Sequence, residues 1–462
     1  MKKLKKAGKI FVIATLLALF IASLLAPMVK STPEYETKLV LITPSRSDLL
    51  EAIKAKFEEY AKKELGVNVE MEFIKAGSPE CMNRIIAWNG KPEADIFFGG
   101  DLTFHEKLKE KGLLEAYEPK SEGYQSLPFE FMGVQIKDHD HMWHPKLWWG
   151  HGFVYNKEVI KKLNLDVPKS WDELLDPKWR DLIVMCTPSR SSSTTINVMI
   201  ILQMKGWDEG WAYWRRLAAN VGTFVQRSHD VHDLVDKGEY AVGFGYHLAA
   251  IVDATKGYPV SIYLDPRGFI VSGVSLLKGA PHPNIAKAFL DWWYTPEAQE
   301  AALSVGGIPV IPNLKIEGPP GTPAAALREA LGDKDNIYEY LKTFQGAALY
   351  DSKFAEEHYK EVAKIFDESI VAKHAELKDA WFTILDVKEL VKGNPQAEAK
   401  LNEAIAAFDK GDYATAKSLA LEAKEMAGAG AGMNWIFIVG VIVVIVIIVA
   451  AYFVLRKKPK KQ

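Results

Sequence analysis

The sequence predicts an α/β protein made of two α/β units, followed by a pair of helices and one long apolar segment. Three observations lead to this prediction. Short apolar runs alternate with helical patterns from residue 38 to residue 101, the alternation begins again after residue 150, and residues 394–427 have helical periodicity that is broken once. Strands separated by helical patterns are typical of βαβ units and of a largely parallel sheet.

The first unit is expected to alternate between strand and helix. A strand is predicted over Lys38–Thr43, a helix over about 47–65 and a second strand over 67–74. Ser78-Pro79 opens the next helix, because proline is favoured in the first helical turn. The last strand lies within 94–101 and ends in Gly-Gly-Asp.

The second unit repeats this pattern. Strands are predicted within 151–156, 181–186, 220–226 and 240–247, with helices over 157–163, over 196–204 and near 231–237. From about Gly268 another strand is followed by helices that continue to about Leu385, and residues 394–427 are predicted to form a helical hairpin.

A turn rich in hydroxyl groups joins the strand at 181–186 to the helix after it. Six Ser and Thr side chains and one Arg lie within residues 189–195. One hydroxyl at this place is enough to cap the helix. The first helical N–H groups, together with hydroxyl donors and an Arg, would also form an anion site. The residues alone leave both interpretations open.

The composition limits the classes of function that the chain is expected to have. The 462 residues are 48% hydrophobic and carry a net charge of −2, with no long basic run in the interior. These features argue against nucleic acid as a partner. No nucleophile motif, phosphate-binding loop or dinucleotide fingerprint is present, so an enzyme is not expected. Cys81 and Cys186 are the only cysteines, and they could form a disulfide or remain two buried thiols.

Both ends of the chain are apolar with basic flanks. Lysines precede the apolar run from Ile10 to Ala26, so residues 1–31 are predicted to be a signal peptide or an uncleaved anchor. Residues 428–434 are predicted to be a flexible linker, Trp435–Leu455 a single membrane-spanning helix, and 456–462 a cytoplasmic tail. This topology places the two α/β units outside the cell membrane, attached to the lipid bilayer by residues 435–455.

Several motifs between Lys38 and Leu385 resemble those of the extracellular solute-binding proteins of ABC importers, in the ferric-iron and sugar-phosphate branch. They include "VLITPSRSDLLEAI", "ADIFFGGDLTFHEKLKEKGLLEAY", "WGHGFVYNKEVIKKLNLDVPKSWDELLDPKW" and "SGVSLLKGAPHPNIAKAFLDWWYTPEAQ". The last of these, a strand followed by "KGAPHP" and a helix that ends in "TPEAQ", is the most characteristic.

The resemblance implies a periplasmic-binding-protein-like fold of type II, in which two lobes joined by two crossing strands close on a ligand. Lobe 1 is expected to comprise 36–135 and 268–390, and lobe 2 to comprise 150–262. Helix starts of both lobes would then line the cleft. The residues expected to contact the ligand are Thr43, Ser45, Arg46, Ser78, Gly100 and Asp101 from the first lobe and Ser189, Arg190, Ser191, Ser192, Tyr246 and His247 from the second.

The resemblance also allows the ligand class to be weighed. Iron-binding members use adjacent tyrosines with a His and a carboxylate, whereas here Tyr246 stands alone beside His247 and Arg46 occupies the place of the ligating His. A cation there opposes Fe(III), which requires anionic oxygen ligands. We therefore expect a small organophosphate-like anion, delivered to an ABC permease in the membrane, with Fe(III) as the alternative ligand and a ligand-sensing receptor as a more distant alternative. No cofactor is expected.

A cluster of histidines and tryptophans precedes the second unit. His139, His141, His144 and His151 lie within one short segment, but their spacing is only a weak indication of a metal site, and none is assigned. Trp148, Trp149 and His151 lie on the expected crossing strand, where they could pack at the hinge or stack on a ligand ring.

Overall fold

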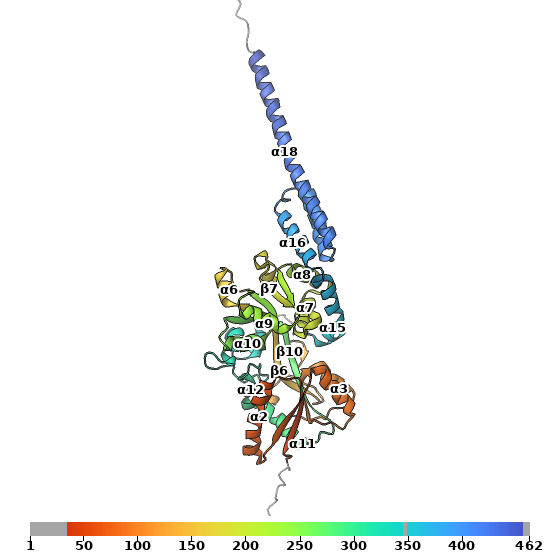
Figure 1. Cartoon of the computed structure of the whole chain (residues 1–462), viewed down its shortest axis with the longest axis vertical. Helices are drawn as coiled ribbons and strands as arrows, with labels where there is room; N and C mark the ends of the chain where they lie inside the picture. The colour runs from red at the N-terminus through yellow and green to blue at the C-terminus, as the bar shows by residue number, and fades with distance from the viewer. Residues whose placement is uncertain (1–34, 345–348, 456–462) are drawn as a thin grey trace, which may run out of the picture.

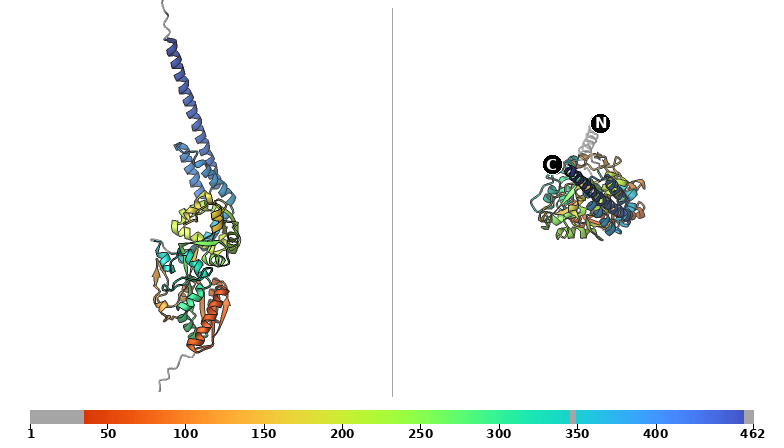
Figure 2. Two further views of the ribbon diagram at one scale, coloured as in Figure 1. Left: turned by 90° about the vertical axis from the view of Figure 1, so that its left-hand side faces the viewer. Right: turned by 90° about the horizontal axis from the view of Figure 1, so that it is seen from above.

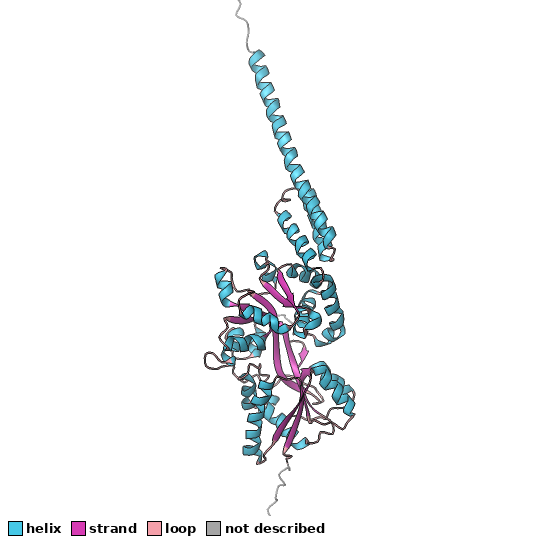
Figure 3. Cartoon of the chain, viewed as in Figure 1, coloured by secondary structure: helices cyan, strands magenta, loops and turns pink. Residues whose placement is uncertain are grey.

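A computed structural model describes residues 35–344 and 349–455 (Figure 1). Its centre is one eight-stranded mixed sheet that runs through both lobes (Figure 3). The order across the sheet is β2 (Glu70–Lys75), β1 (Lys38–Thr43), β3 (Ile96–Asp101), β10 (Val260–Leu276), β6 (His144–Asn156), β9 (Val242–Tyr246), β7 (Ile183–Cys186) and β8 (Val221–Val225).

The first lobe holds the parallel strands β1, β2 and β3, and β10 lies antiparallel beside β3. β1 has the bounds that the apolar run predicts, and five of its six residues are buried. Its helices are α2 (Ser47–Tyr60), which continues into η1 (Ala61–Leu65), α3 (Ser78–Trp88), α4 (Leu102–Glu110), α5 (Glu122–Gln125), α11 (Pro283–Trp293) and α12 (Pro296–Leu303). A small hairpin, β4 (Glu130–Phe131) and β5 (Val134–Gln135), lies apart from the main sheet.

The second lobe holds the parallel strands β7, β8 and β9, and β6 lies antiparallel beside β9. Its helices are α6 (Lys157–Lys162), α7 (Ser192–Lys205), α8 (Trp207–Ala218), α9 (Ser228–Asp236) and α10 (His247–Thr255), with short 3₁₀ turns η2 (Asp172–Leu175), η3 (Pro177–Trp179) and η4 (Pro188–Arg190). α7 begins at Ser192, inside the hydroxyl-rich segment 189–195, so the helix starts earlier than the sequence predicts.

Two long antiparallel strands, β6 and β10, join the lobes. Their pairing begins at Val260 opposite Asn156 and ends at Val274 opposite His144, with irregularities after Leu264 and after Ser272. At about 3.3 Å per residue, a 13-residue strand and a 17-residue strand are long enough to belong to both lobes. The structure therefore confirms the expected two-lobe fold with crossing strands.

Residues after Leu303 do not all belong to the first lobe, which corrects the expected boundary at residue 390. α13 (Pro323–Ala330) and α14 (Ile337–Lys342) pack with the core that includes first-lobe residues. In contrast, α15 (Ser352–Phe366), η5 (Asp367–Val371) and α16 (His374–Lys388) pack with the second-lobe core. The Phe366 ring lies 5.5 Å from the Trp214 ring of α8, so tertiary packing assigns this segment to lobe 2.

The C-terminal hairpin is present and packs beside α16 and α8. It consists of α17 (Pro395–Asp409) and α18 (Tyr413–Leu455), and Arg216 of α8 forms an ion pair with Asp409. α18 continues without a break through 428–434, which corrects the predicted flexible linker (Figures 1 and 2). The Gly residues there disfavour a helix by about 1 kcal/mol each, but Ala residues alternate with them and a long helical segment precedes them.

The remaining sequence predictions concern the ends of the chain. Residues 1–31 and 456–462 lie outside the described residues. The predicted membrane span, Trp435–Leu455, lies in α18, and the side chains of 435–440 and 453–455 are also outside the description. Across the part of the chain that the structure describes, no helix combines the length and the apolar character needed to cross a membrane. The structure therefore does not support that prediction.

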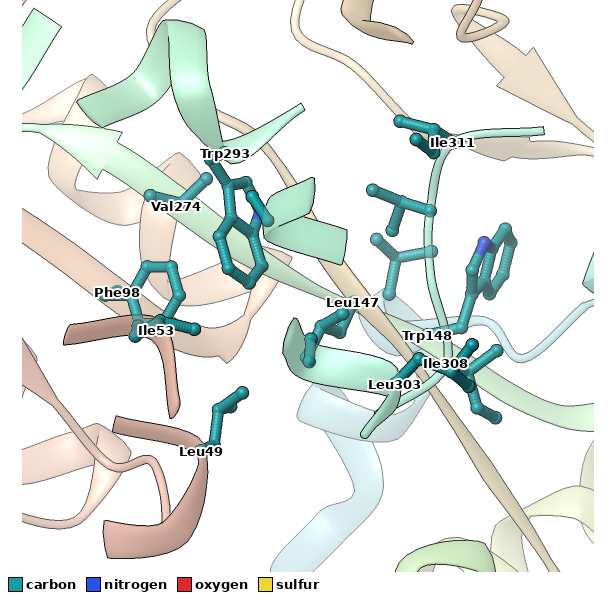
Figure 4. Close-up of a cluster of buried hydrophobic side chains, with 14 of the residues drawn as sticks. Leu49, Ile53, Phe98, Leu147, Trp148, Val274, Trp293, Leu303, Ile308 and Ile311 are labelled. Carbon is teal, nitrogen blue, oxygen red and sulfur yellow. The ribbon is translucent and has the colours of Figure 1, made fainter. Parts of the chain in front are cut away.

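The first-lobe core reaches the crossing strands. Phe98 at the end of β3 packs edge-to-face against Trp293 of α11, with ring centroids 4.9 Å apart (Figure 4). Leu147 and Trp148 of β6 lie beside Leu303 and Ile308 in the same cluster (Figure 4). The crossing strand β6 is thus packed in a continuous apolar core. This core also supports the turns that line the cleft.

Cys81 and Cys186 are two free, buried thiols. Cys81 packs in the first lobe, and burial raises its pKa to about 11. Cys186 ends β7 in the second lobe.

Candidate functional site

The first lobe forms one wall of the site from two strand-to-helix turns. After β1, the Thr43 hydroxyl donates to the Phe98 carbonyl at 2.6 Å, and the Ser45 N–H donates to the Thr43 hydroxyl at 3.0 Å. Gly100 lies two residues after Phe98 with φ 89°, and a Cβ on it would lie 3.5 Å from the Ser78 Cβ. Thr43, Ser45, Ser78 and Gly100, which the sequence predicts to share a site, therefore lie together.

Asp101 lies at the edge of this wall with its carboxylate engaged. One oxygen accepts from the Thr103 N–H at 2.9 Å and caps α4, and the other accepts from the Ser352 hydroxyl at 2.9 Å. Ser352 opens α15, which packs on the second lobe, and Glu356 on the same helix pairs with Lys107 of α4. The sequence predicts Asp101 but not Ser352, because this contact spans 251 residues.

The hydroxyl-rich turn lies in the second lobe, and the structure shows one of the two roles that the sequence allows, the capping of α7. Ser191 is the N-cap of α7: its Oγ accepts from the Thr194 N–H at 3.1 Å and hydrogen-bonds the Ser228 hydroxyl. Ser189, Arg190 and Ser192 are exposed. Within the described part of the chain, the Arg190 guanidinium has no hydrogen bond or ion pair, so it remains available for an anion.

Tyr246 and His247 lie at the end of β9 and the start of α10. The His247 Nδ1 accepts from the Gly150 N–H at 3.1 Å, and burial lowers its pKa to about 3, so the ring is neutral. Burial also raises the pKa of Tyr246, and the Arg46 charge offsets part of this effect. Arg46 of the first lobe and Tyr246 of the second are therefore close enough to interact across the cleft.

A small cavity of about 20 Å³ lies between the first-lobe turn after β1 and the start of α10. This volume is about that of one water molecule. Its lining comes from both lobes and from the crossing strand β6: Ser45, Arg46, Asp48, Leu49, Leu147, Trp148, Trp149, His247, Leu248, Val305 and Gly307. Arg46 is 39% exposed and pairs with Asp48 beside it. Three of the predicted residues, Ser45 and Arg46 from the first lobe and His247 from the second, thus line one cavity.

The sequence prediction missed one residue of the first wall, Lys146. This side chain is 2% exposed, donates from Nζ to the Ser45 Oγ at 2.6 Å and lies 4.3 Å from the centre of the Phe98 ring. Burial lowers its pKa to about 7. The sequence contained a signal for it. Lys146 is a charged residue directly before the largely apolar run "LWWGHGFV" of the same strand, and a charged residue is rarely buried there without a partner.

The four histidines do not form a metal site among the described residues. His144 hydrogen-bonds the Tyr124 hydroxyl at 2.8 Å, and His151 lies 3.2 Å from the Gly268 carbonyl. His139 stacks on Phe129. Trp148 packs in the hinge core, whereas Trp149 lines the cleft cavity and its ring lies 5.5 Å from that of His247.

Comparison with known proteins decides the family. A family model of bacterial extracellular solute-binding proteins matches residues 91–333, just over half of the chain. The chain belongs to this family. A bacterial extracellular solute-binding protein is not an enzyme, and the arrangement described above, two walls of donors at strand ends, is suited to binding.

Individual relatives differ in what their names say they bind. The phosphoglycerate transport regulatory protein PgtC of Salmonella typhimurium is 26% identical over 237 residues, which are 50% of this chain and 54% of PgtC. The match therefore spans about half the length of that relative.

Solved structures show the same fold. The periplasmic binding protein AfuA from Actinobacillus pleuropneumoniae, with fructose-6-phosphate bound, is 24% identical with a TM-score of 0.51 and covers 72% of this chain and 98% of its own. Iron-bound HitA from Pseudomonas aeruginosa is 20% identical with a TM-score of 0.53, and the match covers 71% and 99% of the two chains.

We predict that Asp236, a buried residue at the end of α9, makes stability depend on pH. Burial, and then the nearby Asp253, raise the pKa of Asp236 to about 7, whereas an unfolded Asp titrates near about 3.9. The folded state then binds the proton more tightly, so stability falls as pH rises from about 4 to 7. Asp236→Asn should raise the free energy of unfolding by about 1–2 kcal/mol at pH 8 and by little at pH 4.

Chemical denaturation at the two pH values measures this difference. Asp233→Asn, on the same helix and 41% exposed, is the control and should change stability by less than about 0.5 kcal/mol. A loss of stability in Asp236→Asn at pH 8 would contradict the prediction.

Proposed function

We propose that this protein is the substrate-binding component of an ABC importer and that it captures a small anion carrying a phosphate or phosphonate group. The observation that carries the proposal is that Arg46 from one lobe and the start of α10 in the other line the same cavity. Arg190, in the short turn η4 before α7, is a second exposed cation. Guanidinium groups bind such anions with two parallel hydrogen bonds, and helix N-termini add partial positive charge.

Two relatives support this ligand class by name. PgtC is named for phosphoglycerate transport, and the AfuA structure holds fructose-6-phosphate. Both compounds carry a phosphate ester, and delivery of such a solute to a membrane permease is the role proposed for this chain.

Ferric iron is the second candidate, because HitA shares the fold in an iron-bound form and Tyr246 lines the second wall. The chemistry of the described residues favours Fe(III) less than it favours a phosphate or phosphonate anion. Burial raises the pKa of Tyr246, which disfavours the phenolate that Fe(III) requires, and the nearby Arg46 would repel the metal.

We also propose that α18 attaches the protein to a lipid bilayer. The proposal rests on the uncharged run Trp435–Leu455 in the sequence and on the position of α18, which extends away from both lobes (Figure 1). The side chains from Val441 to Val449 are exposed, which is unfavourable in water.

We predict that Arg46→Gln weakens binding of a phosphate ester at least tenfold, because a charge-assisted hydrogen bond contributes about 1.5–3 kcal/mol. Isothermal titration calorimetry with 3-phosphoglycerate and fructose 6-phosphate measures the affinity. Arg84→Gln is the matched control, since Arg84 is also partly exposed and pairs with a carboxylate on its own helix. If ferric citrate instead gives a visible band that Tyr246→Phe removes, and neither ester binds, the protein carries iron.

We predict that two adjacent serines separate stability from binding. Ser191→Ala should lower the free energy of unfolding by about 1 kcal/mol, because it removes the cap of α7. Ser192→Ala should leave stability unchanged and lower the affinity for the same ester, because Ser192 is exposed at the helix start. Thermal denaturation and calorimetry measure the two effects. Full affinity in both Ser192→Ala and Arg190→Ala would leave this turn with a structural role only.

We predict that a chain ending at Ala427 is released from membranes while the full-length chain stays bound. The apolar part of α18 begins after this residue. Sedimentation of cell membranes after an alkaline carbonate wash separates the two outcomes, since such a wash removes peripheral proteins. Recovery of the full-length chain in the supernatant would contradict the proposed attachment.

A further inference from the structure

Lys146 is a buried cation that the fold leaves without a counter-charge. Its Nζ donates to the Ser45 Oγ at 2.6 Å, and the Phe98 ring lies below it at 4.3 Å. No carboxylate pairs with it among the described residues. A buried ammonium with a single hydrogen bond and no anion costs free energy, and it is not explained by stability.

The surroundings hold Lys146 in place. The Trp293 Nε1 donates to the Lys146 carbonyl at 3.2 Å, and the Trp293 ring packs edge-to-face on Phe98. His105 of α4 lies close enough for the Lys146 charge to act on it, but burial lowers the pKa of His105 to about 3, so it is neutral. The neighbouring residue, Leu147, lines the cleft cavity together with Ser45. The ammonium is therefore rigidly placed one hydroxyl away from the cleft.

Through its hydroxyl group, Ser45 is able to link Lys146 to a ligand by a chain of hydrogen bonds. The strongest donor to the Phe98 carbonyl is the Thr43 hydroxyl at 2.6 Å, whereas the Ser45 hydroxyl lies 3.3 Å from the same carbonyl. The Ser45 hydrogen is thus weakly held and can turn toward an anion in the cleft, while its oxygen accepts from Lys146. Such a chain of hydrogen bonds strengthens each member in a low-dielectric site.

We infer that Lys146, acting through Ser45, compensates the second negative charge of the ligand and makes the cleft selective for dianionic phosphate or phosphonate groups over monoanionic ones. The inference rests on the proposed function. It assigns to Lys146 a role in charge selection, whereas Arg46 and Arg190 bind either kind of anion.

The test uses the full-length protein in detergent and two pairs of probes that differ in charge. Fructose 6-phosphate is compared with fructose 6-sulfate, and 2-aminoethylphosphonate with 2-aminoethanesulfonate, by calorimetry at pH 7. The phosphorus compounds are then mostly dianions, and Lys146, whose pKa burial lowers to about 7, still carries its proton in a large share of the molecules. Wild type should prefer the dianion of at least one pair by tenfold or more. Lys146→Met should remove this preference by weakening the dianion and leaving the monoanion unchanged, and Ser45→Ala should do the same.

Two further measurements separate this role from a structural one. Lys146→Met should keep or raise the melting temperature of the ligand-free protein, because a buried charge without a partner is removed. Lys137→Met is the matched control: Lys137 is 4% exposed and lies 4.4 Å from the Phe129 ring, outside the cleft, and its loss should not change the preference.

The outcomes distinguish this inference from the proposed function. If wild type binds neither dianion, the proposed function fails and the inference falls with it. If wild type binds a dianion but Lys146→Met keeps the preference, weakens both members of a pair equally, or binds normally with a lowered melting temperature, the inference alone is overturned.

Discussion

The antiparallel pairing of β6 with β10 is the interaction on which the rest of this structure depends. These strands are the only members of the sheet, within the described residues, that belong to both lobes, and each lobe adds its own parallel strands to one end of the pair. Helices that follow the parallel strands therefore begin near the crossing region. Ser45 and Arg46 from one lobe and His247 from the other reach a single cavity because of this arrangement.

The two walls that result differ in how their donors are held. In the first lobe, Thr43, Ser45 and Lys146 are buried and linked by hydrogen bonds, so little side-chain entropy is lost when they contact a ligand. In the second lobe, Ser189, Arg190 and Ser192 are exposed, and only Ser191 is fixed by its role as a cap. If the proposed anion binds here, ordering of the first wall would cost less entropy than ordering of the second.

The sequence predicted the parts of this site that depend on local pattern. Strand ends, helix starts and the hydroxyl-rich turn follow from periodicity and capping residues, and the crossing strands followed from the family resemblance. It did not predict the partners of these residues, because Ser191 meets Ser228 and Asp101 meets Ser352 only through tertiary packing. The assignment of α15 and α16 to lobe 1 was wrong for the same reason, and the predicted linker at 428–434 was wrong because composition alone does not determine whether a long helix ends.

Two of the contacts between the lobes, both made by α15 with α4 or its N-cap, are weak. The Lys107–Glu356 pair is about 40% exposed on both sides, and such pairs contribute about 0–1 kcal/mol. The Ser352–Asp101 hydrogen bond adds a net contribution of about 1 kcal/mol. A charged ligand that accepts from Arg46 in one lobe and Arg190 in the other would contribute about 3–6 kcal/mol from two charge-assisted bonds. Such a ligand would therefore contribute more free energy to holding the two lobes together than these two contacts of α15 and α4 do.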